Sequence, residues 1–385
     1  MVKAKFAACL ALMILAGCAG ASRLHRDIDS PDWETRSAAV GNLRSGKLND
    51  TNIPLILRAL DDTVPQVRDY AAYVLAHHIR NRTAGNLFEH ARHASDSAKI
   101  AVAAATQGGH FPDAANDFLI ELLGSSSPDV QLAAAKALQG SDDARKRKPL
   151  MELWRNSPHE ALRVAALVSA SYPAKDARED ENLRECWRQL SIDQPHLLRD
   201  PYVLQAAGGM RVEETGTHIL ELVSDAELRY LAIESLGKMR YVDAVPVLLA
   251  LLEKDGSWVL TRQACSALGR IRAEAAAPVL AMTFVESRPE TSRDAWDRTM
   301  FVALAMIRIG GDDVFEALVS QITNEHKRSI SLACLHEMTG TRLIARDNYW
   351  LYTWEGMQER WRRWWIENRE RVAERLERQS NERDE

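Results

Sequence analysis

The feature that most constrains this chain is a helical pattern that recurs about every 32 residues. In the stretch from Asp61 to His78, one apolar face is defined by positions i, i+3, i+4, i+7 and i+8, which hold Val67, Tyr70, Ala71, Val74 and Leu75. A second apolar stripe precedes it, at Ile53, Ile56, Leu57 and Leu60. Two short amphipathic helices joined by an acidic, proline-containing turn therefore form one unit.

The position of Arg68 marks this unit along the chain. Comparable positions are Arg36, Lys99, Gln131, Arg163, Arg229 and Arg262. A compact residue stands three positions beyond each marker, as Ala71 does beyond Arg68. The long step between Arg163 and Arg229 predicts one further unit, marked by Arg199, and two looser copies lie around Arg298 and Arg328. About ten units are therefore expected.

The recurrence predicts an all-α fold. A compact residue in the second helix of each unit allows close packing, with helix axes about 8–10 Å apart. One helix pair cannot bury its apolar face alone, so neighbouring units must stack around a continuous core. Strand signals are almost absent. The expected architecture is an α-solenoid of about ten helical hairpins.

The pattern in residues 54–78 and 246–271 resembles HEAT repeats, in particular the short bacterial type called PBS-lyase-like. Prolines that fit the opening of the first helix are Pro54, Pro149, Pro246 and Pro278. Aspartates that fit the turn, either as helix caps or as partners of the basic marker, are Asp62, Asp96, Asp129 and Asp225. The resemblance covers about residues 30–335 and departs around 176–210 and 287–299, where bends or insertions are expected.

The end of the chain is rich in tryptophan. One helical stripe holds Trp350, Trp354, Met357, Trp361 and Trp364. A solenoid needs a terminal cap, and bulky aromatic side chains would cover its last apolar face. The alternative is an aromatic surface for a glycan, a lipid headgroup or a protein. The expected organisation is a repeat solenoid over 29–335, followed by a Trp-rich helical cap and charged tail over 336–385.

The start of the chain predicts a secretion signal. Lys3 and Lys5 precede about eleven mostly apolar residues, the layout of a secretory signal. The four residues from Leu15 to Cys18 resemble the lipobox of bacterial lipoproteins. That resemblance implies cleavage of a signal peptide over 1–17, lipidation of Cys18, and a short linker over 18–28. Ala19 after the cysteine favours the outer membrane of a bacterial envelope. The alternative is an ordinary secretory signal.

Composition and motifs exclude several kinds of chemistry. The formal net charge is −5, and removal of residues 1–17 would take two lysines and leave −7, so no basic excess suits nucleic acid. Phosphate-binding glycine loops and a G-x-S-x-G elbow are absent from the sequence. Cys186, Cys265 and Cys334 lie within helical patterns, which favours buried thiols.

Histidine-containing motifs indicate no metal site. Some HEAT-repeat proteins, the deoxyhypusine hydroxylases, bind two irons through repeated His-Glu pairs. The two pairs in this chain, at 159–160 and 336–337, are not at equivalent positions, so a di-iron site is rejected. His90 and His93 are spaced for one helix face but lack a third ligand nearby. The basic run over 145–148 is expected in a solvated loop, with docking to an acidic partner or anionic headgroups as the alternative.

The expected function is a lipid-anchored, non-catalytic scaffold that binds an unidentified protein and needs no cofactor. The concave face lined by second helices is the default docking surface of stacked repeats. Exposed positions on one such helix, Asp69, Tyr73 and His77, are the expected contacts, with Trp354 and Trp361 as further candidates. The alternative is an envelope enzyme or enzyme subunit with its site in the irregular middle or the Trp-rich end. A third possibility is a glycan or cell-wall binder.

Overall fold

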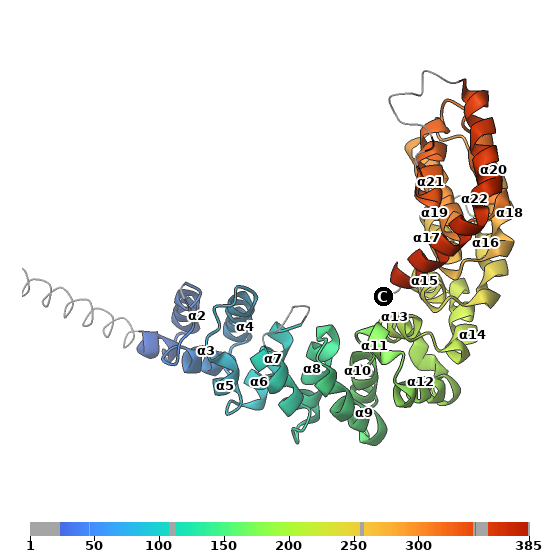
Figure 1. Cartoon of the computed structure of the whole chain (residues 1–385). Coiled ribbons are helices and arrows are strands. Elements are labelled where there is room, and N and C mark those ends of the chain that lie inside the picture. Colours follow the sequence, from blue (N-terminus) through green and yellow to red (C-terminus); the bar gives the residue numbers. More distant parts are fainter. Residues whose placement is uncertain are drawn as a thin grey trace, which may run out of the picture. The chain divides into compact units, whose positions relative to one another are not determined.

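The computed structural model describes residues 24–383 apart from 46, 108–112, 255–257, 342 and 344–352. Contacts divide the chain into unit 1, which ends at Pro173, and unit 2, which begins at Ala174. This division lies beside the stretch where the repeat spacing slips. In the described residues every regular element is a helix (Figure 1), so the all-α prediction is confirmed.

Unit 1 has two layers of helices. Second helices of each hairpin, here called B helices, pack side by side: α2 (Trp33–Asn42), α4 (Pro65–Arg80), α6 (Asp96–Ala105), α8 (Pro128–Ala137) and α10 (Glu160–Ala170). First helices, called A helices, form the other layer: α3 (Ile53–Ala59), α5 (Leu87–Ala91), α7 (Asp113–Leu122) and α9 (Arg147–Asn156).

Unit 2 repeats this arrangement after the short helix α11 (Ala174–Ala177). Its B helices are α13 (Pro201–Met210), α15 (Arg229–Met239), α17 (Trp258–Ile271), α19 (Arg293–Ile309) and α21 (Arg328–Thr339). Its A helices are α12 (Glu181–Asp193), α14 (Glu213–Glu221), α16 (Val245–Lys254), α18 (Ala277–Glu286) and α20 (Asp312–Ser320). Nine A–B pairs follow α2 in the described chain, in agreement with about ten units.

Compact residues occupy the B-layer interface as the sequence predicts. The residues three positions beyond the seven clear markers are at most 1 % exposed: Ala39, Ala71, Val102, Ala134, Ala166, Ala232 and Cys265. Glycine allows a still closer approach in unit 2. A Cβ atom on Gly237 would lie 2.8 Å from the Cα atom of Ala267 on the next B helix. The stack therefore depends on small residues at these positions.

The marker side chains tie each B helix to the turn before it. In at least five units of the described chain the marker donates a hydrogen bond to the carbonyl six residues earlier; the pairs are Arg36–Ser30, Arg68–Asp62, Gln131–Ser125, Arg229–Val223 and Arg328–Ile322. These bonds satisfy turn carbonyls that no helix ladder reaches. The long polar marker is thus a structural residue.

The turn aspartates connect neighbouring repeats. Asp62 accepts hydrogen bonds from Nε and Nη2 of Arg36, at 2.6 and 2.8 Å, and this guanidinium lowers the pKa of the Asp62 carboxyl. Arg199 pairs with Asp225 across the same interval of 26 residues. The missing unit is present as α12 and α13, and Arg199 makes the same pair as Arg36. Arg199 nevertheless precedes α13, and Leu204 occupies the fourth helical position that Arg36 holds in α2.

The C-terminal helix α22 (Trp354–Arg383) packs against α20 and α21. Its buried side chains are Met357, Trp361, Trp365, Val372 and Leu376. The Gln358 side chain donates to the carbonyls of Val319 and Ser320 at the end of α20. This helix therefore covers the last hairpin, which confirms the Trp-rich helical cap.

Candidate functional site

The structure places the three predicted contacts of α4 on one face of that helix. Asp69, Tyr73 and His77 are spaced by four residues, so their side chains lie above one another. Asp69 is exposed, Tyr73 is 46 % exposed and His77 is half-buried. Whether they contact a partner stays a prediction.

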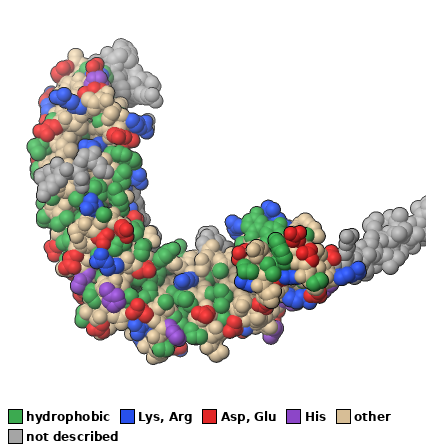
Figure 2. Space-filling view, turned by 180° about the vertical axis from the view of Figure 1, so that it is seen from behind, with side chains coloured by type: hydrophobic (Ala, Val, Ile, Leu, Met, Phe, Trp, Pro, Cys, Tyr) green, Lys and Arg blue, Asp and Glu red, His purple; other side chains and the backbone are tan. Residues whose placement is uncertain are grey.

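Aromatic and basic groups surround Tyr73. Its ring stacks with that of Tyr70, with centroids 6.1 Å apart, and the Arg44 guanidinium lies 5.4 Å from its centroid. Arg44, Tyr70, Tyr73 and His77 are called the α4 patch below. Figure 2 shows hydrophobic side chains gathered beside basic ones at the end of unit 1 that holds α2 and α4. Tyrosine and arginine are enriched among the residues that dominate protein–protein binding energy.

His77 adds an uncharged edge to the α4 patch. Partial desolvation lowers the pKa of its imidazole, and the positive charge of Arg44 lowers it further. Imidazole is already mostly neutral at pH 7 with its ordinary pKa of about 6.5. A neutral His77 leaves Arg44 as the positive group beside the tyrosines. The patch therefore suits an apolar or aromatic anchor with an acceptor at its rim.

The two tryptophans proposed as contacts are used within the protein. Trp361 is 1 % exposed, so the expectation that it contacts a partner is wrong for this structure. Trp354 is half-buried, and the Arg328 guanidinium lies 3.8 Å from its ring centroid. Arg328 therefore covers one face of the Trp354 ring and closes that face to a sugar. Trp350 lies outside the described residues.

Trp365 is the cap residue that the stripe did not include. Its ring stacks on Phe315 of α20, with centroids 4.3 Å apart and planes 8° from parallel. Its Nε1 atom donates to Oδ1 of Asp312 at 2.7 Å. The predicted stripe includes Trp364 instead, which is half-buried and packs edge-on against Trp361. Only the position of α20 selects Trp365 over its neighbour.

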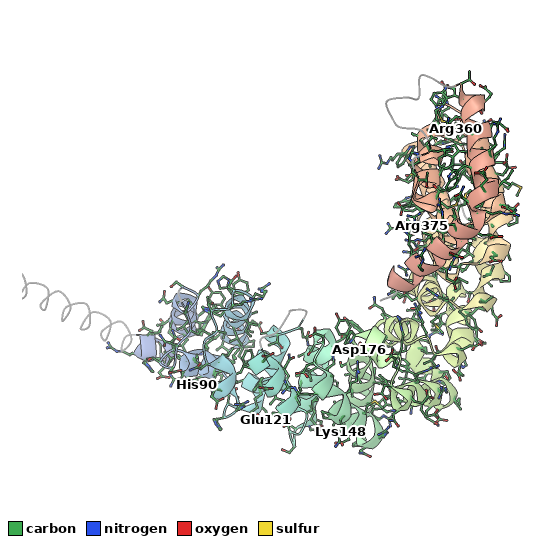
Figure 3. All side chains as sticks on the ribbon, viewed as in Figure 1. His90, Glu121, Lys148, Asp176, Arg360 and Arg375 are labelled. Atoms are coloured by element: carbon green, nitrogen blue, oxygen red, sulfur yellow. The ribbon has the colours of Figure 1, made fainter. Side chains whose placement is uncertain are left out.

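The basic run over 145–148 is only partly solvated, which corrects the expectation of a loop. Lys146 ends a 3-10 turn and is 0 % exposed. Its Nζ atom donates to the carbonyls of Leu138, at 2.8 Å, and Ser141. Burial lowers the pKa of Lys146 to about 7. Arg145 forms ion pairs with two aspartates, whereas Lys148 is exposed (Figure 3).

The cysteines and histidines have structural surroundings. Cys186, Cys265 and Cys334 are buried, as predicted, and burial raises the pKa of Cys265 and Cys334 to about 12. A thiol with so high a pKa is a poor nucleophile at neutral pH. His90 contacts Asp50 at 3.2 Å. Within the described residues no three His, Cys, Asp or Glu side chains form a group that could hold a metal ion.

A polar depression of about 170 Å³ lies on the B-helix face of unit 2. Its lining comes from α15 and α17: Glu234, Arg262, Gln263, Ser266, Ala267 and Arg270. It lies neither in the irregular stretch 176–210 nor at the Trp-rich helix, where the enzyme alternative would place a site. Its size suits a few waters or a single side chain of a partner.

Cys18 and the predicted signal segment lie outside the described residues. Among the helices that the structure describes, none combines the length and the apolar character that a bilayer crossing requires.

Comparison with known proteins finds similarity to a repeat family over part of the chain. A family model described as HEAT repeats matches residues 86–171 and 217–297. Among solved structures, human deoxyhypusine hydroxylase in complex with glycerol is 16 % identical, over 85 % of this chain and 98 % of that chain, with a TM-score of 0.27. A mutant of Kap121p is 12 % identical, over 85 % of this chain and 38 % of that chain, with a TM-score of 0.36. No curated protein matches the sequence.

Proposed function

We propose that this HEAT-repeat protein is a non-catalytic scaffold that binds a protein partner through the B-helix face of unit 1, close to a membrane of the bacterial envelope. The α4 patch supports this proposal most strongly. Tyr73 remains 46 % exposed although it stands between the buried Ala71 and Val74 on the same helix. A half-exposed tyrosine flanked by a second tyrosine and an arginine has the composition of an interface anchor.

Attachment through lipid on Cys18 would set where this surface works. The linker from Cys18 to the predicted repeats at residue 29 has about ten residues and reaches at most about 35 Å when fully extended. A tether of that length confines the repeats to the membrane surface and raises the effective concentration of any partner held there. One acyl chain binds only marginally, whereas two or three anchor a protein stably.

Substitution of Cys18 tests the anchor. The Cys18→Ser chain cannot form the thioether, so we expect it to lose label from a fed fatty-acid analogue and to leave the membrane fraction. Cys186→Ser is the matched control, because that thiol is buried in α12 and should not change labelling. Equal labelling of Cys18→Ser and the unaltered chain would contradict lipidation.

Photocrosslinking in cells tests the scaffold. A benzophenone amino acid in place of Tyr73 should give discrete adducts with one or a few proteins, because the side chain points out of a B helix. The same group in place of Tyr202, a 63 % exposed tyrosine on α13 of unit 2, is the matched control. Adducts at Tyr73 that do not exceed those at Tyr202 would overturn the proposed docking face.

A further inference from the structure

In the described part of unit 2, three B helices are each followed by an arginine with a left-handed backbone conformation. Arg211, Arg240 and Arg272 have φ angles of 56°, 59° and 57°, and follow α13, α15 and α17. This left-handed region favours glycine, which commonly ends helices, because other residues place Cβ close to a carbonyl oxygen. The sequences before them are similar: AGGM, LGKM and LGRI. Arginine therefore recurs where glycine would be easier to accommodate.

Two arginine side chains in this part of unit 2 reach the next repeat in the same register. Nε of Arg211 donates at 3.0 Å to the carbonyl of Lys238, two residues before Arg240. Arg178, just after α11, makes the same bond to Gly209, two residues before Arg211, at 2.7 Å. Each bond satisfies a carbonyl at a helix C-terminus and fixes the plane of the guanidinium. Arg178, Arg211, Arg240 and Arg272 are called the arginine ladder below.

At the last B helix, an arginine of the C-terminal helix α22 makes the capping bond in place of a ladder arginine. After α21 the left-handed position is held by Gly340, and Arg375 of α22 donates to the carbonyl of Met338, two residues before it (Figure 3). A guanidinium from another part of the chain thus performs the same capping. Capping of a helix end therefore requires no arginine at the left-handed position itself.

The ladder arginines lie close enough to affect one another. All four are half-buried. Desolvation lowers the pKa of Arg178, Arg211 and Arg240, and the charges of other ladder arginines lower the pKa of Arg178 and Arg240 further. Like charges held together in a partly desolvated row favour the approach of negative groups. In a chain with net charge −5 such a row is a local exception.

The spacing of the ladder indicates the shape of its ligand. B helices that pack directly have axes about 8–10 Å apart, so successive rungs advance by about that distance. A peptide in the extended polyproline II conformation has three residues per turn and rises about 3.1 Å per residue, so every third residue advances by about 9 Å and stays on the same face. We propose that the arginine ladder binds an extended acidic segment of a partner protein, with a carboxylate at about every third residue. This proposal rests on the scaffold function but uses a surface of unit 2 rather than the α4 patch.

Binding of a defined peptide to the full chain tests the ladder. The probe is a fluorescent peptide with glutamate at every third of ten positions, among serine and glycine, and its anisotropy is followed at two salt concentrations. We expect saturable binding that weakens as salt rises. A peptide with glutamine in place of glutamate should bind at least tenfold more weakly. Failure of the glutamate peptide to bind, or equal binding of the glutamine peptide, would overturn the proposal.

Ladder variants locate the site. Arg211→Gln combined with Arg240→Gln should weaken peptide binding at least tenfold. Arg211→Gly combined with Arg240→Gly provides a second variant, because glycine adopts the left-handed conformation easily and preserves the helix ends. Arg82→Gln is the matched control: Arg82 has φ 55° at the end of α4 in unit 1 but is outside the ladder, so binding should stay within twofold. Peptide binding that both double variants retain would overturn the assignment.

Two other polyanions distinguish the ligand class. Vesicles of anionic phospholipid and a single-stranded oligonucleotide are tested against the same variants. Binding of either one that depends on the ladder and exceeds peptide binding would show a headgroup or phosphate site and overturn the acidic-peptide proposal. Crosslinking at Tyr73 does not involve the ladder, so failure here leaves the scaffold test intact.

Discussion

Lys146 gives the sharpest test of how this structure balances burial against charge. Lys146→Met keeps the length of the side chain and removes the titrating group. The side chain is 0 % exposed, and desolvation lowers its pKa from 10.5 to about 7. Because the folded pKa is lower than the unfolded one, the folded chain binds fewer protons between these values. Stability should therefore rise with pH across the window from about 7 to about 10.5.

The size of this effect follows from the shift. One pKa unit corresponds to about 1.4 kcal/mol, so the Lys146 contribution rises by about 2.5 kcal/mol between pH 6 and pH 9. The carbonyls of Leu138 and Ser141 also stabilise the ammonium form, so this value is an upper bound. In Lys146→Met the rise disappears, and the Ser141 carbonyl loses its Nζ donor at a cost of about 1–3 kcal/mol.

Urea unfolding of both chains at pH 6, 7, 8 and 9 measures the difference between them. A stack of repeats need not unfold in one step, so hydrogen exchange in α8–α10 gives the local free energy of opening. Lys148→Met, at an exposed position of the same run, is the control and should show no pH-dependent difference. The free energies of unfolding of Lys146→Met and the unaltered chain should differ by an amount that changes with pH. A change of less than about 0.5 kcal/mol in this difference between pH 6 and pH 9 would refute a depressed pKa.

Three further substitutions test the packing. Gly237→Ala should destabilise unit 2 by about 1–3 kcal/mol in urea unfolding, because its Cβ would meet the next B helix, whereas Gly140→Ala, with nothing within 4 Å, should change little. Trp365→Phe keeps a stacked ring but loses the hydrogen bond to Asp312. The free energy of opening of α20, measured by hydrogen exchange, should therefore fall by about 1–2 kcal/mol. Asp62→Asn should cost about 1–3 kcal/mol above pH 4, and the difference should vanish as acid titrates the native carboxylate; an unchanged difference at pH 2 would contradict the ion pair.

The sequence predicts the layers of this fold because its repeat pattern records burial directly. Ala71 and Val74 are buried on the apolar face of α4, as the spacing requires. The prediction places Arg199 less well. Its charge partner, Asp225, lies at the expected interval, but α13 begins later and puts Leu204 in the helical position. Charge pairing and helix register are separate constraints, and one marker residue cannot report both.

Residues that act across repeats are the ones that sequence reasoning missed. Lys146 looks like part of a solvated basic run, and only the carbonyls at the end of α8 and in the following turn make its burial possible. The ladder arginines carry a readable signal, because a G-x-[MI]-R ending recurs at 211, 240 and 272. Their left-handed backbone, and the bond of Arg211 to the end of the next B helix, depend on stacking. A pattern within one repeat cannot show that.

Affinity for the protein captured at Tyr73 tests the docking face most directly. Calorimetric titration compares the unaltered chain with Tyr73→Ala and Tyr202→Ala. Binding through the α4 patch predicts at least a tenfold loss of affinity for Tyr73→Ala, since truncation of an interface anchor costs about 2 kcal/mol or more. Tyr202→Ala should stay within twofold. Equal affinities of all three chains would contradict partner binding at the α4 patch.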